Sequence, residues 1–184
     1  DAGFHSNIDL ANRFHKYRSS HPGKRLKIIT MVREPVGRDI SDAFENWNVF
    51  FKTSDHTTLT AEMFFAYMEN HRFDYTLNWF DSEFKAWTGK DIFELPFDKE
   101  AGYSIWKFKE FDLLCMKLEK MNEIFGKATS DFFGFSLTMD NFSNTSGDKE
   151  IKDLYREVMA GFRLNEQQAN IVYGSRLVNH FYTA

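Results

Sequence analysis

The sequence lacks the residues and patterns that mark several large classes of protein. Cysteine occurs once in 184 residues, at Cys115, so no disulfide can form within the chain, and its apolar neighbours predict that it is buried. The six histidines and this cysteine show no metal-ligand spacing, which argues against a structural zinc site. No uninterrupted apolar run is long enough to cross a membrane, and the first residues do not resemble a signal peptide.

An excess of basic residues is also missing. The chain carries 23 Lys and Arg against 27 Asp and Glu, a formal net charge of -4, which argues against a general nucleic-acid-binding surface. A small anionic ligand is still compatible with this balance, because it needs only a few local donors. Apolar residues make up 42% of the chain, enough to bury a core and to argue against disorder. We therefore expect a single domain over residues 1–184.

The first part of the chain alternates helix-like and strand-like segments. Residues 7–20 predict a polar helix that ends at the Pro-Gly pair that follows. The short apolar run at 27–32 predicts a strand buried on both faces of a parallel sheet. A helix is expected from Pro35 onward. Its apolar stripe consists of Ile40, Phe44, Trp47 and Phe51.

The later segments continue this alternation. Helices are predicted over 59–71 and 74–87, and residues 91–108 look like a strand hairpin that turns at 99–102. Residues 113–118 predict another buried strand. The remainder reads as helical, with a polar loop at 141–148. Strands alternating with helices indicate an α/β fold with a helical C-terminal region.

One segment carries recognisable chemistry. A buried strand delivers Arg33 at its carboxyl end, where open α/β sheets bind ligands, and a helix begins at once. The free N–H groups at a helix start favour anions at the same place. Ser41 follows eight residues after Arg33, early in the helix. The guanidinium could bind two phosphate oxygens while the hydroxyl donates to the same group.

The pattern from this strand through Arg33-Glu34-Pro35 to Arg38, Ser41 and Phe44 resembles the 3'-phosphate motif of the P-loop sulfotransferase superfamily. The resemblance implies a P-loop NTPase-like parallel sheet flanked by helices, and 3'-phosphoadenosine-5'-phosphosulfate as donor substrate, with no metal. Carried over by position, Arg33 and Ser41 would bind the donor's 3'-phosphate. Arg38 would brace the loop of the same donor site, and Phe44 would be a core residue.

More narrowly, four stretches resemble the capsular polysaccharide synthesis proteins of that superfamily. The resemblance implies sulfate transfer to a glycan acceptor in surface polysaccharide synthesis. A bacterial enzyme of this kind would be cytoplasmic, and a eukaryotic counterpart would face the Golgi lumen. The four stretches are Asn78–Phe84, Pro96–Tyr103, Lys117–Met121 and Tyr173–Tyr182.

The sequence departs from the superfamily in two places. Nothing before the strand matches the loop that cradles the 5'-phosphosulfate, so we expect a domain truncated at its N-terminus. The basic-glycine segment of other members is absent unless Gly174-Ser175-Arg176 replaces it. The resemblance places His5 where some members carry a loop histidine, which makes it the candidate base for the acceptor hydroxyl, although an ordinary surface histidine is the simpler interpretation.

Other side chains have simpler expected roles. We expect His180 to pack on neighbouring aromatic rings at a helix end. Asp81 and Glu83 could contact a sugar, although a solvated helix face is the simpler interpretation.

Two alternatives to a sulfotransferase remain open. The absent donor loop is compatible with a non-catalytic sulfotransferase-like scaffold or glycan-binding subunit in a polysaccharide assembly. A nucleotide kinase fragment is less attractive, because no acidic strand end offers metal binding.

Overall fold

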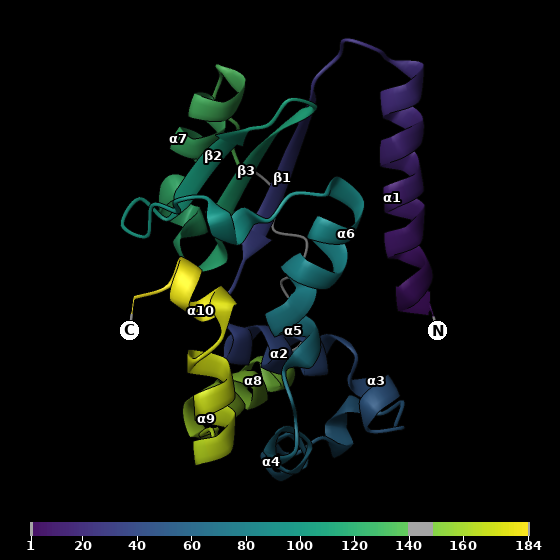
Figure 1. Ribbon diagram of the computed structural model, residues 1–184. Helices are drawn as coiled ribbons and strands as arrows, with labels where there is room; N and C mark the ends of the chain where they lie inside the picture. Colours follow the sequence, from purple (N-terminus) through teal and green to yellow (C-terminus); the bar gives the residue numbers. More distant parts are fainter. Residues whose placement is uncertain (1, 140–148, 184) are drawn as a thin grey trace.

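A small mixed sheet forms the centre of the upper half of the molecule. The computed structural model describes the backbone of residues 2–139 and 149–183, and the side chains of residues 11–139 and 151–183. Three strands, β1 (Leu26–Val32), β2 (Tyr103–Lys107) and β3 (Phe111–Lys117), lie in the order β1-β3-β2. β1 runs parallel to β3 with Leu26 opposite Phe111, whereas β2 runs antiparallel to β3 (Figure 1).

Helices make up most of the remaining described chain. The α-helices are α1 (Ala2–Ser20), α2 (Pro35–Glu45), α3 (Trp47–Phe50), α4 (Ala61–Glu69), α5 (Asp74–Trp79), α6 (Lys85–Thr88), α7 (Met121–Phe133), α8 (Lys149–Gly161), α9 (Glu166–Tyr173) and α10 (Arg176–Phe181). Short turns of other helix types are η1 (His56–Thr58), the π-helical η2 (Phe80–Phe84), η3 (Ile92–Glu94) and η4 (Leu118–Lys120). No helix in the described ranges combines the length and apolarity that a bilayer crossing needs.

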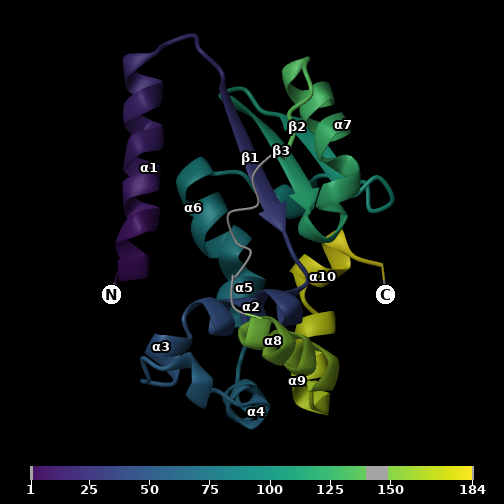
Figure 2. The same ribbon diagram turned by 180° about the vertical axis from the view of Figure 1, so that it is seen from behind.

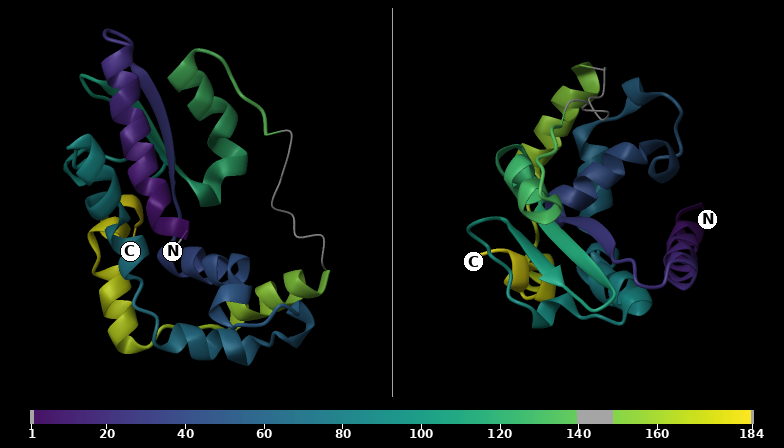
Figure 3. Two further views of the ribbon diagram at one scale, coloured as in Figure 1. Left: turned by 90° about the vertical axis from the view of Figure 1, so that its right-hand side faces the viewer. Right: turned by 90° about the horizontal axis from the view of Figure 1, so that it is seen from above.

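The helices divide into two groups around the sheet. α7 packs on one face against β2 and β3, and α6 and α1 lie toward the other face (Figure 3). α2, α3, α4, α8 and α9 gather beyond the carboxyl end of β1, where α8 lies beside α2 and α4 (Figures 1 and 2). The carboxyl ends of the two parallel strands therefore point at this second group.

The two parallel strands differ in burial. Every residue of β3 is buried, as expected for its apolar run. In β1 burial alternates, and Ile29 and Met31 are 40% and 51% exposed. The prediction that β1 is buried on both faces was wrong, because β1 is the edge strand and α7 covers the neighbouring strands instead.

The sheet is also less parallel than predicted. Residues 91–98 were expected to form a strand, but they contain only η3 and irregular chain. The Asp91 carboxylate accepts the N–H of Phe93 and starts a turn. The alternating Phe93, Leu95 and Phe97 pack against the main core without any strand partner. The second half of the expected hairpin is β2, which pairs with β3, and a P-loop NTPase-like sheet is not confirmed.

The predicted helices agree with the structure more closely than the predicted strands do. α2 begins at Pro35, where the Glu34 carboxylate accepts the N–H of Gly37. The helix predicted over 74–87 appears as α5, η2 and α6, and Gly89 ends it with a φ of 70°. The expected stripe after Pro35 is interrupted at Asn46, between α2 and α3. The polar loop predicted at 141–148 lies outside the described residues.

Candidate functional site

The carboxyl end of β1 and the first turns of α2 bring two predicted site residues together. Arg33 directly follows β1, and Ser41 lies on α2. The Nη1 atom of Arg33 donates to Ser41 Oγ at 2.7 Å. Both side chains are partly buried and line the same cavity. The spacing of eight residues therefore places the guanidinium and the hydroxyl at one point, as an anion site requires.

A third side chain completes this cluster from a distant part of the sequence. The Nη2 atom of Arg33 donates to the hydroxyl of Tyr155 at 3.0 Å, and this hydroxyl lies 3.0 Å from Ser41 Oγ. Tyr155 belongs to α8, which packs against α2. The sequence analysis missed it, because a tyrosine in an amphipathic helix carries no local signal of ligand binding. We call Arg33, Ser41 and Tyr155 the anion cluster.

The positive charge of Arg33 has no carboxylate partner in the described part of the chain. Its two hydrogen bonds go to neutral hydroxyl oxygens. Most other arginines with described side chains pair with a carboxylate. These are Arg18, Arg25, Arg38, Arg72, Arg156 and Arg176. A partly buried guanidinium without a counter-ion is suited to an anionic ligand.

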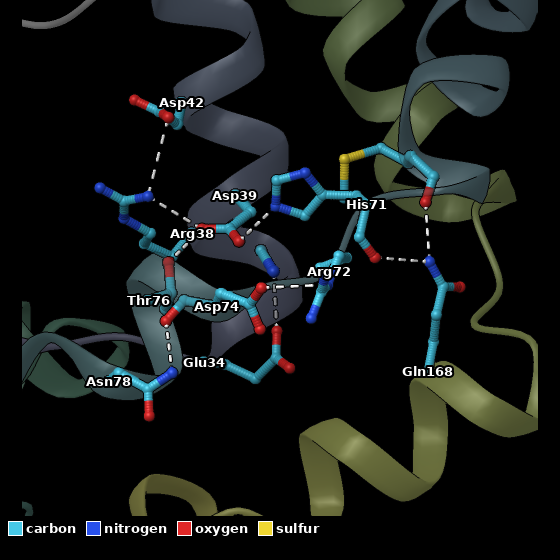
Figure 4. A network of polar contacts seen from close by, with 12 residues as sticks. Glu34, Arg38, Asp39, Asp42, His71, Arg72, Asp74, Thr76, Asn78 and Gln168 are labelled. Atoms are coloured by element: carbon cyan, nitrogen blue, oxygen red, sulfur yellow. Dashed lines mark hydrogen bonds and ion pairs between the residues drawn. The ribbon is translucent and has the colours of Figure 1, made fainter.

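Arg38, the third predicted donor-site residue, belongs to a separate polar network. Its Nη1 atom bonds Asp39 Oδ1 at 2.9 Å and approaches the Asp42 carboxylate at 3.7 Å. Asp39 is 4% exposed. Its carboxylate also accepts a hydrogen bond from Thr76 Oγ1, and its Oδ2 atom lies 2.7 Å from His71 Nε2 (Figure 4). We call Arg38, Asp39, His71 and Thr76 the Asp39 network.

The Asp39 network holds the start of α2 against neighbouring elements. Thr76 lies on α5, and His71 lies in the turn after α4. The carbonyl of His71 also accepts from Gln168 of α9 (Figure 4). Burial by itself raises the pKa of Asp39, but the hydrogen bonds from His71, Thr76 and Arg38 outweigh it and lower the pKa below its usual value. Asp39 is therefore a charged anchor, and Arg38 contributes to it from the same helix, with Asp39 and Asp42 of α2 as its carboxylate partners.

A cavity of about 350 Å³ opens beside the anion cluster. Arg33, Ser41 and Arg38 form part of its polar wall, and Asp42 and Glu45 add acidic groups to the lining. Tyr75, Trp79 and Phe80 form an aromatic wall. Thr30 and Trp79 also line a neighbouring cavity of about 560 Å³ along β1 and α1. These volumes fall in the range of small-molecule sites.

The carboxyl end of β3 adds polar groups from the stretch Lys117–Met121, to which the sequence assigned no individual role. Glu119 follows β3, and its carboxylate accepts the backbone N–H of Glu34 at 2.6 Å and the hydroxyl of Tyr182 at 3.3 Å. Burial, together with the charge of Glu119, raises the pKa of Tyr182. Lys117 is 7% exposed, and its Nζ lies 4.7 Å from the centre of the Tyr182 ring. Burial lowers the pKa of this lysine. A position at the end of a parallel strand was the available sequence signal for both residues.

The other predicted residues have different outcomes. His5 lies on α1, and its side chain is outside the described residues. The His180 ring packs edge-on against Phe93, as predicted, and burial lowers the pKa of His180. Cys115 is buried, as predicted. Phe44 stacks on Phe64 with ring centres 3.9 Å apart and packs against the core, as predicted.

The Gly174-Ser175-Arg176 segment does not present a free basic group. Arg176 contacts the carboxylates of Asp81 and Asp91, each at 3.1 Å. This arrangement ties α10 to η2 and to the start of η3. The Asp81 side chain is 33% exposed, so its carboxylate lies at the surface and pairs there with the 54%-exposed Arg176.

The described residues contain no cluster of His, Cys, Asp and Glu that could hold a metal ion. Residues 55–183 match the model of the family described as "Putative capsular polysaccharide synthesis protein". No curated protein and no solved structure matches the chain. Arg33, Arg38 and Ser41 precede the matched segment, whereas Tyr155 lies within it.

Proposed function

Because the chain belongs to the family of putative capsular polysaccharide synthesis proteins, we propose that it transfers sulfate from 3'-phosphoadenosine-5'-phosphosulfate to a carbohydrate hydroxyl. The family covers more than half of the chain and connects it with polysaccharide synthesis. The nucleotide donor and the sulfate chemistry are our proposal, and they rest on the resemblance of the segment from β1 to Phe44 to a 3'-phosphate motif. A cytoplasmic site of action is also our proposal, and it rests on the family's connection with capsule synthesis.

The observation that carries the proposal is that Arg33 has no carboxylate partner among the residues that the structure describes. Its guanidinium contacts the Ser41 hydroxyl at the end of a strand and faces a cavity. A 3'-phosphate would supply the missing negative charge and accept hydrogen bonds from both side chains. The aromatic wall of Tyr75 and Trp79 offers a surface for the rest of a nucleotide.

The reaction requires little covalent chemistry from the protein. The acceptor oxygen forms a bond to the donor sulfur while the sulfur–oxygen bond to the 5'-phosphate breaks, and adenosine 3',5'-bisphosphate leaves. A base takes the proton of the acceptor hydroxyl. His5 stays our candidate for this base. Arg33 and Ser41 would hold the nucleotide in position, which is the main protein contribution in related phosphoryl transfers.

Calorimetry with adenosine 3',5'-bisphosphate tests the donor site. We expect Arg33→Ala to weaken binding by about 2–4 kcal/mol, because charged hydrogen bonds to the phosphate are lost. Arg163→Ala is a matched control, since Arg163 is exposed and its side-chain hydrogen bonds within the described part of the chain go to the carbonyls of Ala160 and Phe162. Equal affinity of the Arg33→Ala variant and the unaltered protein would remove Arg33 from the site.

Transfer of labelled sulfate to a polysaccharide acceptor tests the activity itself. The labelled product should appear with the unaltered protein and decline strongly with Arg33→Ala. A protein that binds the polysaccharide but neither binds the bisphosphate nor transfers sulfate would be a glycan-binding scaffold instead.

A further inference from the structure

The Tyr155 hydroxyl lies within hydrogen-bonding distance of both Arg33 and Ser41. It is 3.0 Å from Arg33 Nη2 and 3.0 Å from Ser41 Oγ, while Arg33 and Ser41 are 2.7 Å apart. The three polar groups therefore form a closed triangle. Two corners come from the segment that follows β1, and the third comes from α8, 114 residues beyond Ser41.

The hydrogen bonds within this triangle leave one donor unused. Arg33 donates to both hydroxyl oxygens. Ser41 and Tyr155 carry one hydroxyl hydrogen each, and one of these lies in the contact between them. Within the described residues, the second hydroxyl hydrogen has no acceptor. The cluster thus has one donor that lacks an acceptor, and a phosphate oxygen could supply this acceptor.

The core holds the Tyr155 ring in place. Tyr155 packs edge-on against Phe44, with ring centres 5.1 Å apart, and Phe44 stacks on the buried Phe64. α8 also contacts both α2 and α4. The hydroxyl is therefore positioned by packing before any ligand arrives, so little ordering is needed on binding.

We propose that Tyr155 is the third ligand of the 3'-phosphate, together with Arg33 and Ser41. This inference rests on the proposed donor function. A terminal phosphate has three oxygens that only accept hydrogen bonds, and these can replace the mutual contacts of the triangle. Tyr155 thereby selects nucleotides that carry a 3'-phosphate over those with a free 3'-hydroxyl.

Tyr155→Phe tests this role, because it removes the hydroxyl and keeps the ring that packs on Phe44. We expect the affinity for adenosine 3',5'-bisphosphate to fall about tenfold, the value of one hydrogen bond to a charged group. The affinity for adenosine 5'-monophosphate, which lacks the 3'-phosphate, should stay unchanged. The unfolding temperature without ligand should also stay within about 2 °C, since the packed ring remains.

Tyr173→Phe is the matched control, because this tyrosine is 56% exposed and lies outside the anion cluster. It should bind both nucleotides as the unaltered protein does. If Tyr155→Phe binds the bisphosphate as tightly as the unaltered protein, the inference about Tyr155 is wrong. The proposed donor site of Arg33 and Ser41 is then unaffected. An equal loss for both nucleotides would mean a structural role and would also overturn it. If the unaltered protein does not bind the bisphosphate, the proposed function fails and the inference fails with it.

Discussion

Removal of the Asp39 carboxylate tests how the loop that carries the anion cluster is held. In Asp39→Ala, Arg38, His71 and Thr76 lose their common acceptor. Breaking a buried charged network costs about 3–5 kcal/mol. The lower end of this range of costs applies here, because the Arg38 and His71 side chains are 33% and 26% exposed and can bind water. We expect the free energy of unfolding to fall by about 3 kcal/mol.

Urea unfolding at pH 7, followed by tryptophan fluorescence, measures this loss. Asp39→Asn keeps the shape and one acceptor oxygen, so its loss should be smaller, about 1–2 kcal/mol. Asp153→Asn is the control, because its ion pair with Arg156 is on the surface and should contribute less than about 0.5 kcal/mol. A loss below about 1 kcal/mol in Asp39→Ala would refute the anchoring role of the Asp39 network.

The contribution of the Asp39 network to the free energy of unfolding should also depend on pH in the acidic range. Folding lowers the pKa of Asp39 below its usual value of 3.8, because the hydrogen bonds outweigh the opposing effect of burial. Such a carboxyl stabilises the fold above its unfolded pKa, and this stabilisation is lost as the pH falls through the lower folded pKa. The difference in unfolding free energy between the unaltered protein and Asp39→Asn should therefore hold at pH 5 and narrow below about pH 4. A difference that is constant from pH 5 to pH 3 would contradict this origin of the stability.

Two further predictions concern residues away from the anion cluster. Arg176→Ala should lower the free energy of unfolding by about 1–2 kcal/mol, because the 8%-exposed Asp91 loses one of its two cationic partners and Asp81 loses its own; an unchanged urea midpoint would show that the contact contributes nothing. Cys115 is buried, and burial raises the pKa of its thiol, so iodoacetamide at pH 8 should modify the folded protein at least about a hundredfold more slowly than the protein in urea, as measured by mass spectrometry. Similar rates in both states would mean that this strand opens readily.

Residues 91–108 differ most clearly between the predicted and the observed secondary structure. Alternation of apolar residues predicted a strand from Phe93 to Phe97, but only the part from Tyr103 is a strand. Alternation shows that side chains have two environments; it does not supply a hydrogen-bonding neighbour. The same limit applies to β1, whose apolar run suggested a central strand. Its position at the edge depends on which strands and helices pack beside it.

The local sequence from β1 to α2 determined the pairing of Arg33 with Ser41 and the start of a helix at Pro35. A strand, a sharp turn and two helical turns span too short a distance for these groups to separate. The tertiary structure decided what local sequence does not encode, because packing joins residues that lie from 37 to 122 positions apart. It placed Tyr155 on the same guanidinium, buried Asp39 between α2 and α5, and engaged Arg176 with two carboxylates.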